Sequence, residues 1–283
     1  MQIQKSFKDE NAKLYLVPTP IGNLGDITLR AIEILSAVDY IASEDTRNTG
    51  KLLKHLEISK KQISFHEHNA VERIPVLLDL LQNGHSIAQV SDAGMPSISD
   101  PGELLVSACI ESNIDVVALP GASAGITALV ASGLAAQPYV FYGFLPRKAG
   151  LQRRFLDTKK NYPETQIFYE SPFRVAKTLE IFLEIYGDRA AVLAREVTKL
   201  HEEYRRGLIS DILASIETQP IKGECLLIIS GATQAQVPEN TLTYKEQVKE
   251  LMAVGLTSKE AIKRISKMNQ VEKQLVYQAY HNG

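Results

Sequence analysis

The 283-residue chain has no tryptophan and only two cysteines, Cys109 and Cys225, which lie far apart and outside any CxxC pattern. The sequence therefore supports neither a disulfide framework nor a zinc ribbon, and it favours the reducing cytoplasm as the compartment. No apolar run approaches the ~20 residues of a membrane span. The first residues, MQIQKSFKDENAK, lack the apolar core of a signal peptide. We expect a cytoplasmic, globular protein with no targeting segment and no membrane partner.

A strong charge of either sign is also missing. The chain has 31 Lys and Arg residues against 33 Asp and Glu residues, for a formal net charge of -2. An RNA partner would therefore be bound by local basic patches and not by the field of the whole protein. Between Thr241 and Gly283, seven Lys and Arg residues stand against four Asp and Glu residues. Composition leaves two interpretations of this segment open, a solvated surface and a face that contacts RNA.

Short apolar runs alternate along the chain with stretches in which leucine and isoleucine recur at helical spacing. Hydrophobic residues make up 45% of the sequence, which is typical of globular proteins and sufficient for a sizeable core. The alternation predicts an α/β fold whose helices cover a sheet. The expected strands are residues 14–17, 39–42, 86–90, 115–119, 139–144, 166–169, 190–194 and 225–229.

Turn and capping signals divide the chain into three predicted parts. The turn Leu119-Pro120-Gly121-Ala122-Ser123 follows the fourth expected strand and marks a domain boundary. We predict one α/β domain over residues 13–120, a second over 121–236 and a small helical tail over 241–283. In the tail, Thr243 with Glu246 and Thr257 with Glu260 have capping-box spacing, which predicts two helix starts.

The segments that follow the expected strands are rich in glycine, proline and charged residues. Ligands of open α/β sheets gather at the carboxyl ends of strands, so these segments together predict a composite site. They read, in order, PTPIGNLGD (18–26), SEDTR (43–47), VSDAGMPSISDPG (90–102), PGASA (120–124), GFLPRK (143–148), YESPFR (169–174) and REVTKLHEEY (195–204).

The third of these segments combines features of a ligand loop and of a helix start. Asp92 is available to accept hydrogen bonds from a ligand, and Gly94 lets a ligand approach the backbone. Asp100, Pro101 and Glu103 have the order of an N-cap, a first helical residue and the acid of a capping box. The structural alternative is a tight turn between a strand and a helix.

Several other reaction classes lack their motifs. The run Gly22-Asn23-Leu24-Gly25-Asp26 matches neither GxGxxG nor GxxxxGK[ST], so we expect no nucleoside triphosphate site. No GxSxG frame supports a serine hydrolase. His66 and His68 would share one face of an extended segment, as metal ligands do, but no third ligand is apparent. We therefore expect no metal.

Eight ordered motifs resemble the tetrapyrrole methylase superfamily of S-adenosylmethionine (SAM)-dependent enzymes, and within it the branch that methylates ribosomal RNA of the small subunit. The resemblance covers about Lys13 to Gly231. It implies two α/β domains with SAM in the cleft between them, and a homodimer. The motifs are PTPIGNLGD, SEDTRNTGKLL, VSDAGMPSISDPG, LPGASAGITALV, GFLPRK, YESPFR, TKLHEE and GECLLIISG.

The resemblance also implies which residues bind SAM, the substrate whose product is S-adenosylhomocysteine. Two groups contribute, one from each predicted domain. From the first motifs come Asp92, Ala93, Gly94, Met95, Ser123 and Ala124, and from the later ones Tyr169, Glu170, Ser171, Gly223 and Glu224.

The implied reaction is transfer of a methyl group to the ribose 2′-hydroxyl of a cytidine in the decoding centre of 16S rRNA. Because that hydroxyl is a poor nucleophile, a carboxylate or histidine near it would accept its proton. The sequence leaves five candidates open for this role or for substrate positioning: Glu170, Glu196, Glu44, Asp45 and His66. We hypothesise that the acids after the second and sixth expected strands flank the ribose.

RNA phosphates are expected on basic residues of the same segments. The expected contacts are Arg47, Arg147, Lys148, Arg153 and Arg154, with Lys199, Arg205 and Arg206 at the margin. Two alternatives remain open: a tetrapyrrole C-methyltransferase of cobalamin or siroheme synthesis, and a SAM- and RNA-binding module without turnover.

Overall fold

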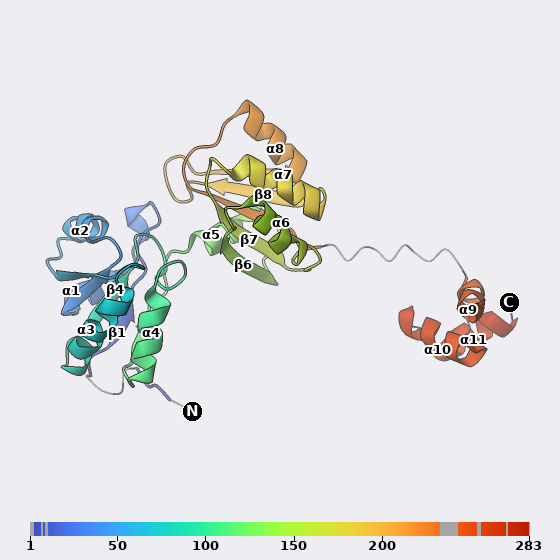
Figure 1. Cartoon of the computed structure of the whole chain (residues 1–283), viewed down its shortest axis with the longest axis horizontal. Coiled ribbons are helices and arrows are strands. Elements are labelled where there is room, and N and C mark those ends of the chain that lie inside the picture. The colour runs from blue at the N-terminus through green and yellow to red at the C-terminus, as the bar shows by residue number, and fades with distance from the viewer. Residues whose placement is uncertain are drawn as a thin grey trace. The chain divides into compact units, whose positions relative to one another are not determined.

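In the computed structural model, the described residues form two five-stranded sheets with their helices, followed by three further helices (Figure 1). The structure describes residues 3–6, 8, 11–232, 243–253, 256–269 and 271–282. Contacts divide the chain into two units, Met1–Gly231 and Ala232–Gly283. Both sheets belong to the first unit, and the predicted α/β fold with a helical tail is confirmed.

The first sheet is entirely parallel, with strand order β3-β2-β4-β1-β5. Helices α1 and α2 pack on one face through Leu35 and Leu53, and α3 and α4 pack on the other through Leu77 and Leu105. Such double coverage explains why all four residues of the central strand β4 are buried, Gln89 included. The elements are β1 (Leu14–Leu16), η1 (Leu24–Asp26), α1 (Leu29–Ala37), β2 (Tyr40–Ser43), α2 (Thr46–His55), β3 (Lys61–Ser64), α3 (Ala70–Gln82), β4 (Ile87–Val90), α4 (Gly102–Glu111) and β5 (Val116–Ala118).

The second sheet is mixed, with strand order β6-β7-β10-β8-β9. Strand β10 runs antiparallel to both of its neighbours, β7 and β8. Helices α6, α7 and α8 cover one face, and α5 covers the other together with Ile21 of the first sheet's β1–α1 loop. The elements are α5 (Ala124–Ser132), β6 (Tyr139–Phe144), α6 (Ala149–Asp157), β7 (Thr165–Glu170), α7 (Val175–Tyr186), β8 (Ala190–Arg195), β9 (Glu203–Leu208), α8 (Ile209–Thr218) and β10 (Cys225–Ile229).

This topology brings three strand ends and two strand starts, those of β9 and β10, to a single edge of the second sheet. The carboxyl ends of β6, β7 and β8 lie together there, because β10 reverses direction between β7 and β8. Cys225, the first residue of β10, therefore pairs with both Glu170 and Arg195. Segments that are distant in sequence thus meet where a ligand would bind.

Two strands were missed by the sequence analysis, and both are edge strands. Residues 61–64 (KQIS) form β3, and residues 203–208 (EYRRGL) form β9. Each contains more polar than apolar side chains, so neither shows the buried-strand pattern. The last two residues of the segment 195–204, Glu203 and Tyr204, therefore belong to β9 and pair with β8.

The start of α4 differs from the capping-box prediction. The helix begins at Gly102, and neither Pro101 as N-cap nor Glu103 makes a side-chain capping bond. Instead the Asp100 carboxylate accepts hydrogen bonds from the backbone N–H groups of Ser97 and Gly102, at 2.8 to 3.0 Å. Asp100 thus stabilises the turn before the helix as well as its first N–H.

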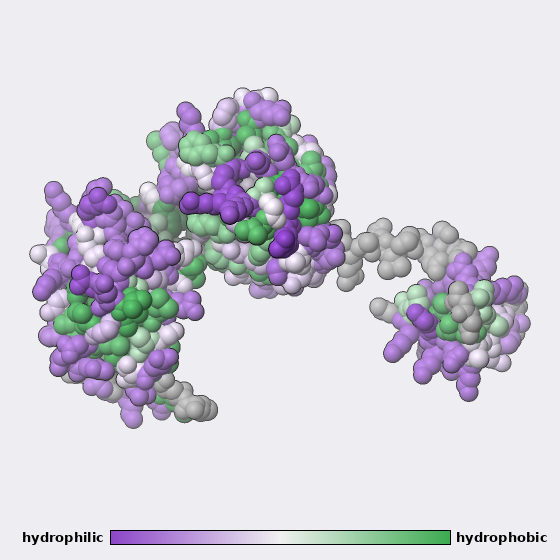
Figure 2. Space-filling model, in the orientation of Figure 1, coloured by the Kyte–Doolittle hydropathy of each residue, from purple (hydrophilic) through white to green (hydrophobic). Residues whose placement is uncertain are grey.

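The second unit contains α9 (Tyr244–Ala253), α10 (Ser258–Met268) and α11 (Lys273–Asn282), packed around Val248, Ile262 and Val276. The predicted capping interactions at Thr243 and Thr257 are both present. On the face that Figure 2 draws, hydrophilic residues border these helices. The cationic side chains of α10 are exposed: Lys259, Lys263, Arg264 and Lys267.

The predicted domain boundaries stay predictions. Gly121 lies in the connection between β5 of the first sheet and α5 of the second. Residues 233–236, at the predicted end of the second domain, and residues 241–242, at the start of the predicted tail, lie outside the described residues.

Candidate functional site

A cavity of about 510 Å³, here called the main cavity, is lined by strand-end segments of both sheets. The first sheet contributes residues that follow β1, β2, β4 and β5, and the second contributes residues at the ends of β6, β7 and β8 and at the start of β10. Its lining comprises Ile21, Glu44, Ser91–Met95, Ile98–Asp100, Ser123, Ala124, Phe144, Tyr169–Pro172, Val197 and Gly223–Leu226.

All eleven residues expected to bind SAM line the main cavity. They come from four separate segments of the chain, so their assembly is a property of the fold and not of one motif. Of the five expected catalytic candidates, only Glu44 and Glu170 line it. Most of the apolar residues that line the main cavity were not expected from the sequence. The rule that ligands bind at strand ends points to Phe144 and Val197, whereas no sequence signal points to Leu226, inside an antiparallel strand.

Two glycine-containing loops of the first sheet are bonded to each other beside the cavity. Thr19 and Gly94 exchange backbone hydrogen bonds of 3.0 Å, and the Thr19 hydroxyl donates to the carbonyl of Ser91. Gly94 has a φ of +81°, and an added Cβ would lie 3.3 Å from the carbonyl oxygen of Ala122. Glycine at this position is therefore required by backbone conformation and by the protein's own atoms, a reason that the sequence analysis did not foresee.

Glu44 follows β2 and its carboxylate reaches the loop after β4. Its Oε2 accepts a hydrogen bond of 3.1 Å from the backbone N–H of Asp92. Burial raises the pKa of Glu44 above its ordinary value, and the nearby carboxylates of Asp92 and Asp100 act in the same direction. The Asp92 N–H and His66 oppose the shift only in part. Glu44 is thus a cavity-lining acid with no cationic hydrogen-bond partner among the described residues.

Glu170, at the end of β7, is fully engaged in the fold. It is 2% exposed, and its Oε1 accepts a hydrogen bond from the Ser171 N–H at 2.8 Å. Its Oε2 accepts one from the Thr178 hydroxyl at 2.7 Å and lies 3.4 Å from Nη2 of Arg174. These contacts tie the end of β7 to the start of α7, so the carboxylate acts as a structural acceptor.

The other three catalytic candidates lie outside the main cavity. Asp45 caps α2 and pairs with Arg47 at 2.7 Å, which lowers the pKa of its carboxyl to about 2. His66 follows β3 and contacts Asn69 at 3.3 Å. Glu196, after β8, accepts hydrogen bonds from the Glu224 N–H and from Lys199, and these hold its pKa below the ordinary value.

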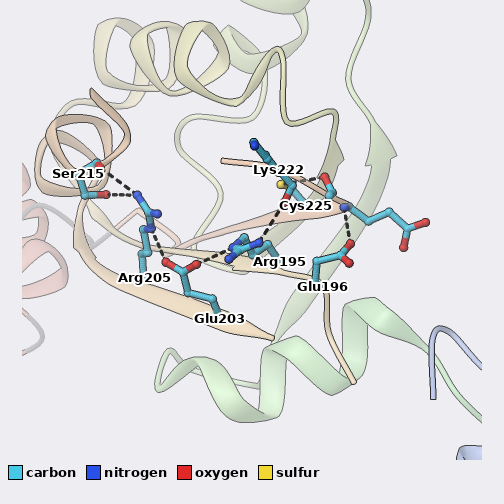
Figure 3. Close-up of polar contacts among 9 residues, drawn as sticks. Arg195, Glu196, Glu203, Arg205, Ser215, Lys222 and Cys225 are labelled. Atoms are coloured by element: carbon cyan, nitrogen blue, oxygen red, sulfur yellow. Dashed lines mark hydrogen bonds and ion pairs between the residues drawn. The ribbon is translucent and has the colours of Figure 1, made fainter. Parts of the chain in front are cut away.

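Arginine and glutamate side chains form a chain of contacts at the same edge of the second sheet (Figure 3). Glu203 accepts hydrogen bonds from both Arg195 and Arg205, and these bonds lower the pKa of its carboxyl. Arg205 also donates to the carbonyl and hydroxyl oxygens of Ser215 at 3.0 Å. Arg195 donates to the carbonyl of Lys222, just before β10.

Lys199 links the loop after β8 to both sheets. Its ammonium lies 3.1 Å from Glu196 and 2.9 Å from Glu224. Its carbon chain occupies the space in which a Cβ of residue 22 would lie, and Gly22 has a φ of +149°. Lys199 therefore contacts the loop after β1 while it neutralises two acids of the second sheet.

The residues expected to contact RNA differ in whether their side chains are already bonded to other groups of the protein. Arg153 pairs with Glu184 of α7 at 2.8 Å, and Arg206 donates to the carbonyls of Ala131 and Ser132. By contrast, three cations are exposed and have no acidic partner among residues 11–232: Arg147, Lys148 and Arg154. None of these residues lines the main cavity.

The main cavity fits SAM in size and in chemistry. Its volume lies within the range of ~300 to 1,000 Å³ that encloses cofactor-sized ligands. Ile21, Val197 and Leu226 supply apolar wall, while Asp92 and Glu44 supply acceptor oxygens and negative charge suited to hydroxyl groups and a sulfonium. In the part of the chain that the structure describes, no group of three His, Cys, Asp or Glu side chains could hold a metal, and no helix could cross a membrane.

Comparison with known proteins agrees with this geometry. The family described as Tetrapyrrole (Corrin/Porphyrin) Methylases matches residues 13–213. The chain is 61% identical to "Ribosomal RNA small subunit methyltransferase I" of Streptococcus pyogenes serotype M1, over 100% of both chains. It is 46% identical to the protein of the same name from Bacillus subtilis (strain 168), over 98% of each.

Solved structures show the same fold at low sequence identity. A cobalt precorrin-4 methyltransferase superposes with a TM-score of 0.57 at 16% identity, covering 77% of this chain and 94% of that one. A uroporphyrin-III-C-methyltransferase from Thermus thermophilus superposes with a TM-score of 0.54 at 18% identity, covering 78% and 94%. The chain belongs to the tetrapyrrole (corrin/porphyrin) methylase family.

Proposed function

We propose that the protein is a SAM-dependent methyltransferase that methylates the ribose 2′-hydroxyl of a cytidine in the decoding centre of 16S rRNA. One observation carries the SAM site: a single cavity collects every residue implied for it, from both sheets. The substrate class rests on full-length relatives named for small-subunit rRNA. The product of the donor is S-adenosylhomocysteine.

The protein's main task in such a reaction is to position the acceptor and remove its proton. The sulfonium of SAM supplies the activated methyl group. Asp92 and the backbone of Ala93 and Gly94 form the side of the cavity that orients the donor. Ser123, which follows β5, also lines the cavity. In-line alignment of the hydroxyl with the methyl carbon then supplies much of the rate acceleration.

Glu44 is the proposed proton acceptor. It lines the main cavity, and burial raises its pKa toward the range in which a carboxylate is a better base. Glu170 is saturated by Ser171, Thr178 and Arg174, which favours a positioning role for it. Asp45, His66 and Glu196 lie outside the cavity.

RNA phosphates are proposed to contact the exposed cations Arg47, Arg147, Lys148 and Arg154. Arg153, Arg205 and Arg206 are less suited to this role, because each is paired within the fold. Arg47 is also paired, with its neighbour Asp45, but its side chain is 86% exposed. The proposed partner is 16S rRNA within the small subunit, and the proposed compartment is the cytoplasm. A homodimer is supported by Phe173 and Leu200, large apolar side chains that are 96% and 93% exposed.

A second candidate, tetrapyrrole C-methylation, is favoured only by the fold shared with tetrapyrrole methyltransferases. Incubation with radiolabelled SAM and three acceptors separates the candidates: small subunits from cells lacking this methylation, naked 16S rRNA, and uroporphyrinogen. We expect label in 16S rRNA, at a cytidine whose 3′ linkage resists alkali. Label in the uroporphyrinogen alone would contradict the proposal, and SAM binding without transfer to any acceptor would indicate a binding module.

A further inference from the structure

A second hollow of about 240 Å³, here called the side pocket, adjoins the main cavity. The loop after β1 and the first two turns of α2 form its walls. Its lining comprises Thr19, Pro20, Gly22, Leu24, Asn48, Thr49, Lys51, Leu52, Ser91 and Asp92. Its volume is below the ~300 Å³ at which pockets for drug-sized ligands begin, so it suits one base or one nucleoside.

The two cavities share a wall. Ser91 and Asp92 line both of them, so a group in the side pocket lies next to a ligand in the main cavity. The Asp92 carboxylate accepts a hydrogen bond of 3.1 Å from Nδ2 of Asn48, which belongs to the side pocket. Glu44, the proposed base, contacts the backbone N–H of the same Asp92. A methyl acceptor in the side pocket and the proposed base Glu44 would thus both lie beside a donor in the main cavity.

The lining of the side pocket suits a nucleotide that is turned out of its RNA strand. Pro20, Leu24 and Leu52 offer apolar surface for the face of a base, and the Asn48 amide offers a donor and an acceptor for its edge. Enzymes that do chemistry on a base extrude its nucleotide into such a pocket, and we infer the same placement for a nucleotide whose ribose is the acceptor. Leu24, Asn48 and Lys51 lie within the motifs PTPIGNLGD and SEDTRNTGKLL, but none of the three was an expected site residue.

Positive charge lies at the rim of the side pocket. Lys51 is exposed on α2, three residues from Asn48 and therefore on the same helical face. It has no acidic partner among residues 11–232. Arg47 and Lys54 extend this face by one turn on each side and are also exposed. The spacing suits successive phosphates of a single strand.

We propose that the side pocket receives the target nucleotide and that Lys51 binds the phosphate beside it. This inference rests on the proposed RNA methyltransferase function, and it names where the acceptor binds. SAM occupies the main cavity, and the 2′-hydroxyl of the target ribose reaches its methyl carbon directly, beside Ser91 and Asp92, which line both cavities.

A steric test distinguishes the side pocket from the surface around it. Leu24→Trp fills the side pocket from an exposed position that does not line the main cavity. The control is Leu29→Trp, at an exposed residue of α1 that lines neither cavity. We expect Leu24→Trp to lower kcat/KM for undermethylated 30S subunits at least tenfold, with S-adenosylhomocysteine affinity within twofold of wild type. Unchanged kcat/KM would overturn the proposal, and so would weakened S-adenosylhomocysteine affinity, because the pocket would then belong to the SAM site.

A charge test examines Lys51. The S-adenosylhomocysteine-loaded protein is titrated with undermethylated 30S subunits at several salt concentrations. Lys51→Glu is compared with Lys177→Glu, which changes an exposed residue of α7. We expect Lys51→Glu to weaken binding at least tenfold and to reduce the salt dependence by about one ion. Equal behaviour of the two variants would remove Lys51 from the RNA contact. If wild type transfers no methyl group to RNA, the proposed function fails and this inference with it.

Discussion

The first and second sheets both place acidic side chains at the edge that faces the main cavity, but the two sets differ in their contacts. Glu44 and Asp92 of the first sheet accept hydrogen bonds from an N–H and an amide, without a cationic hydrogen-bond partner among residues 11–232. In the second sheet, Glu170, Glu196 and Glu203 are each paired with arginine or lysine.

This difference indicates different roles for the acidic side chains of the two sheets. A carboxylate that is neutralised by a cation and donors is a weak base, because those contacts stabilise its charged form. A half-buried carboxylate with few donors holds a proton more readily. The first sheet is therefore suited to proton transfer and acceptor binding, while the second sheet supplies a rigid wall.

The largest effect is expected from removing the base. Glu44→Gln keeps the shape of the side chain but cannot accept a proton, so turnover on undermethylated 30S subunits should fall by about 10²- to 10⁴-fold. Affinity for S-adenosylhomocysteine, measured by calorimetry, should change little. Thermal stability should not fall, because loss of a carboxylate that burial disfavours removes a cost at neutral pH. Turnover near the wild-type value would show that Glu44 is not the base, and it would contradict the assignment of proton transfer to the first sheet.

Glu170→Gln is the matched change in the second sheet. It removes the ion pair with Arg174 and leaves Ser171 or Thr178 with a poorer acceptor, so unfolding free energy should fall by about 1–3 kcal/mol. Turnover of the folded fraction should fall less than tenfold. Denaturant titration and turnover on one preparation measure both quantities. A large loss of turnover at unchanged stability would instead make Glu170 the base.

Much of this arrangement could be read from the sequence. Buried strands such as Cys225–Ile229 are unbroken apolar runs, and the glycine- and proline-rich segments between elements pointed to the edge where the main cavity lies. The polar edge strands β3 and β9 lack that signal, because their side chains are largely solvated. Spacing also could not show which acid is neutralised. Glu170 meets Thr178 only because α7 packs against β7, and Glu44 meets Asp92 from 48 residues away.

A smaller effect is expected at Glu203. The pKa of this carboxyl is lowered by Arg195 and Arg205, so the contacts stabilise the fold above the unfolded pKa, and the gain is lost as pH falls. Glu203→Gln should reduce unfolding free energy by about 1 kcal/mol at neutral pH, since the pairs are partly exposed. Denaturant titrations should show the difference from wild type shrinking at acid pH. A difference that is constant with pH would argue against an ionic contribution.

The smallest effect is expected at Arg153, which its partner Glu184 already neutralises. Arg153→Gln should leave binding to 30S subunits within about twofold of wild type, whereas Arg147→Gln, on an exposed and unpaired cation, should reduce the salt dependence by about one ion. Binding titrations over a salt series compare the two. If Arg153→Gln gave the larger change, its ion pair would have to open when RNA binds.

The pH dependence of the single-turnover methyl-transfer rate, in wild type and in Glu44→Gln, tests the central claim most directly. Protonated Glu44 cannot act as a base, and its pKa is raised by burial, with Asp92 and Asp100 adding to the shift. The wild-type rate should therefore fall as pH drops, with an apparent pKa above that of an ordinary glutamate. The Glu44→Gln rate should be low and nearly independent of pH. The same acid limb in both proteins would show that another group takes the proton.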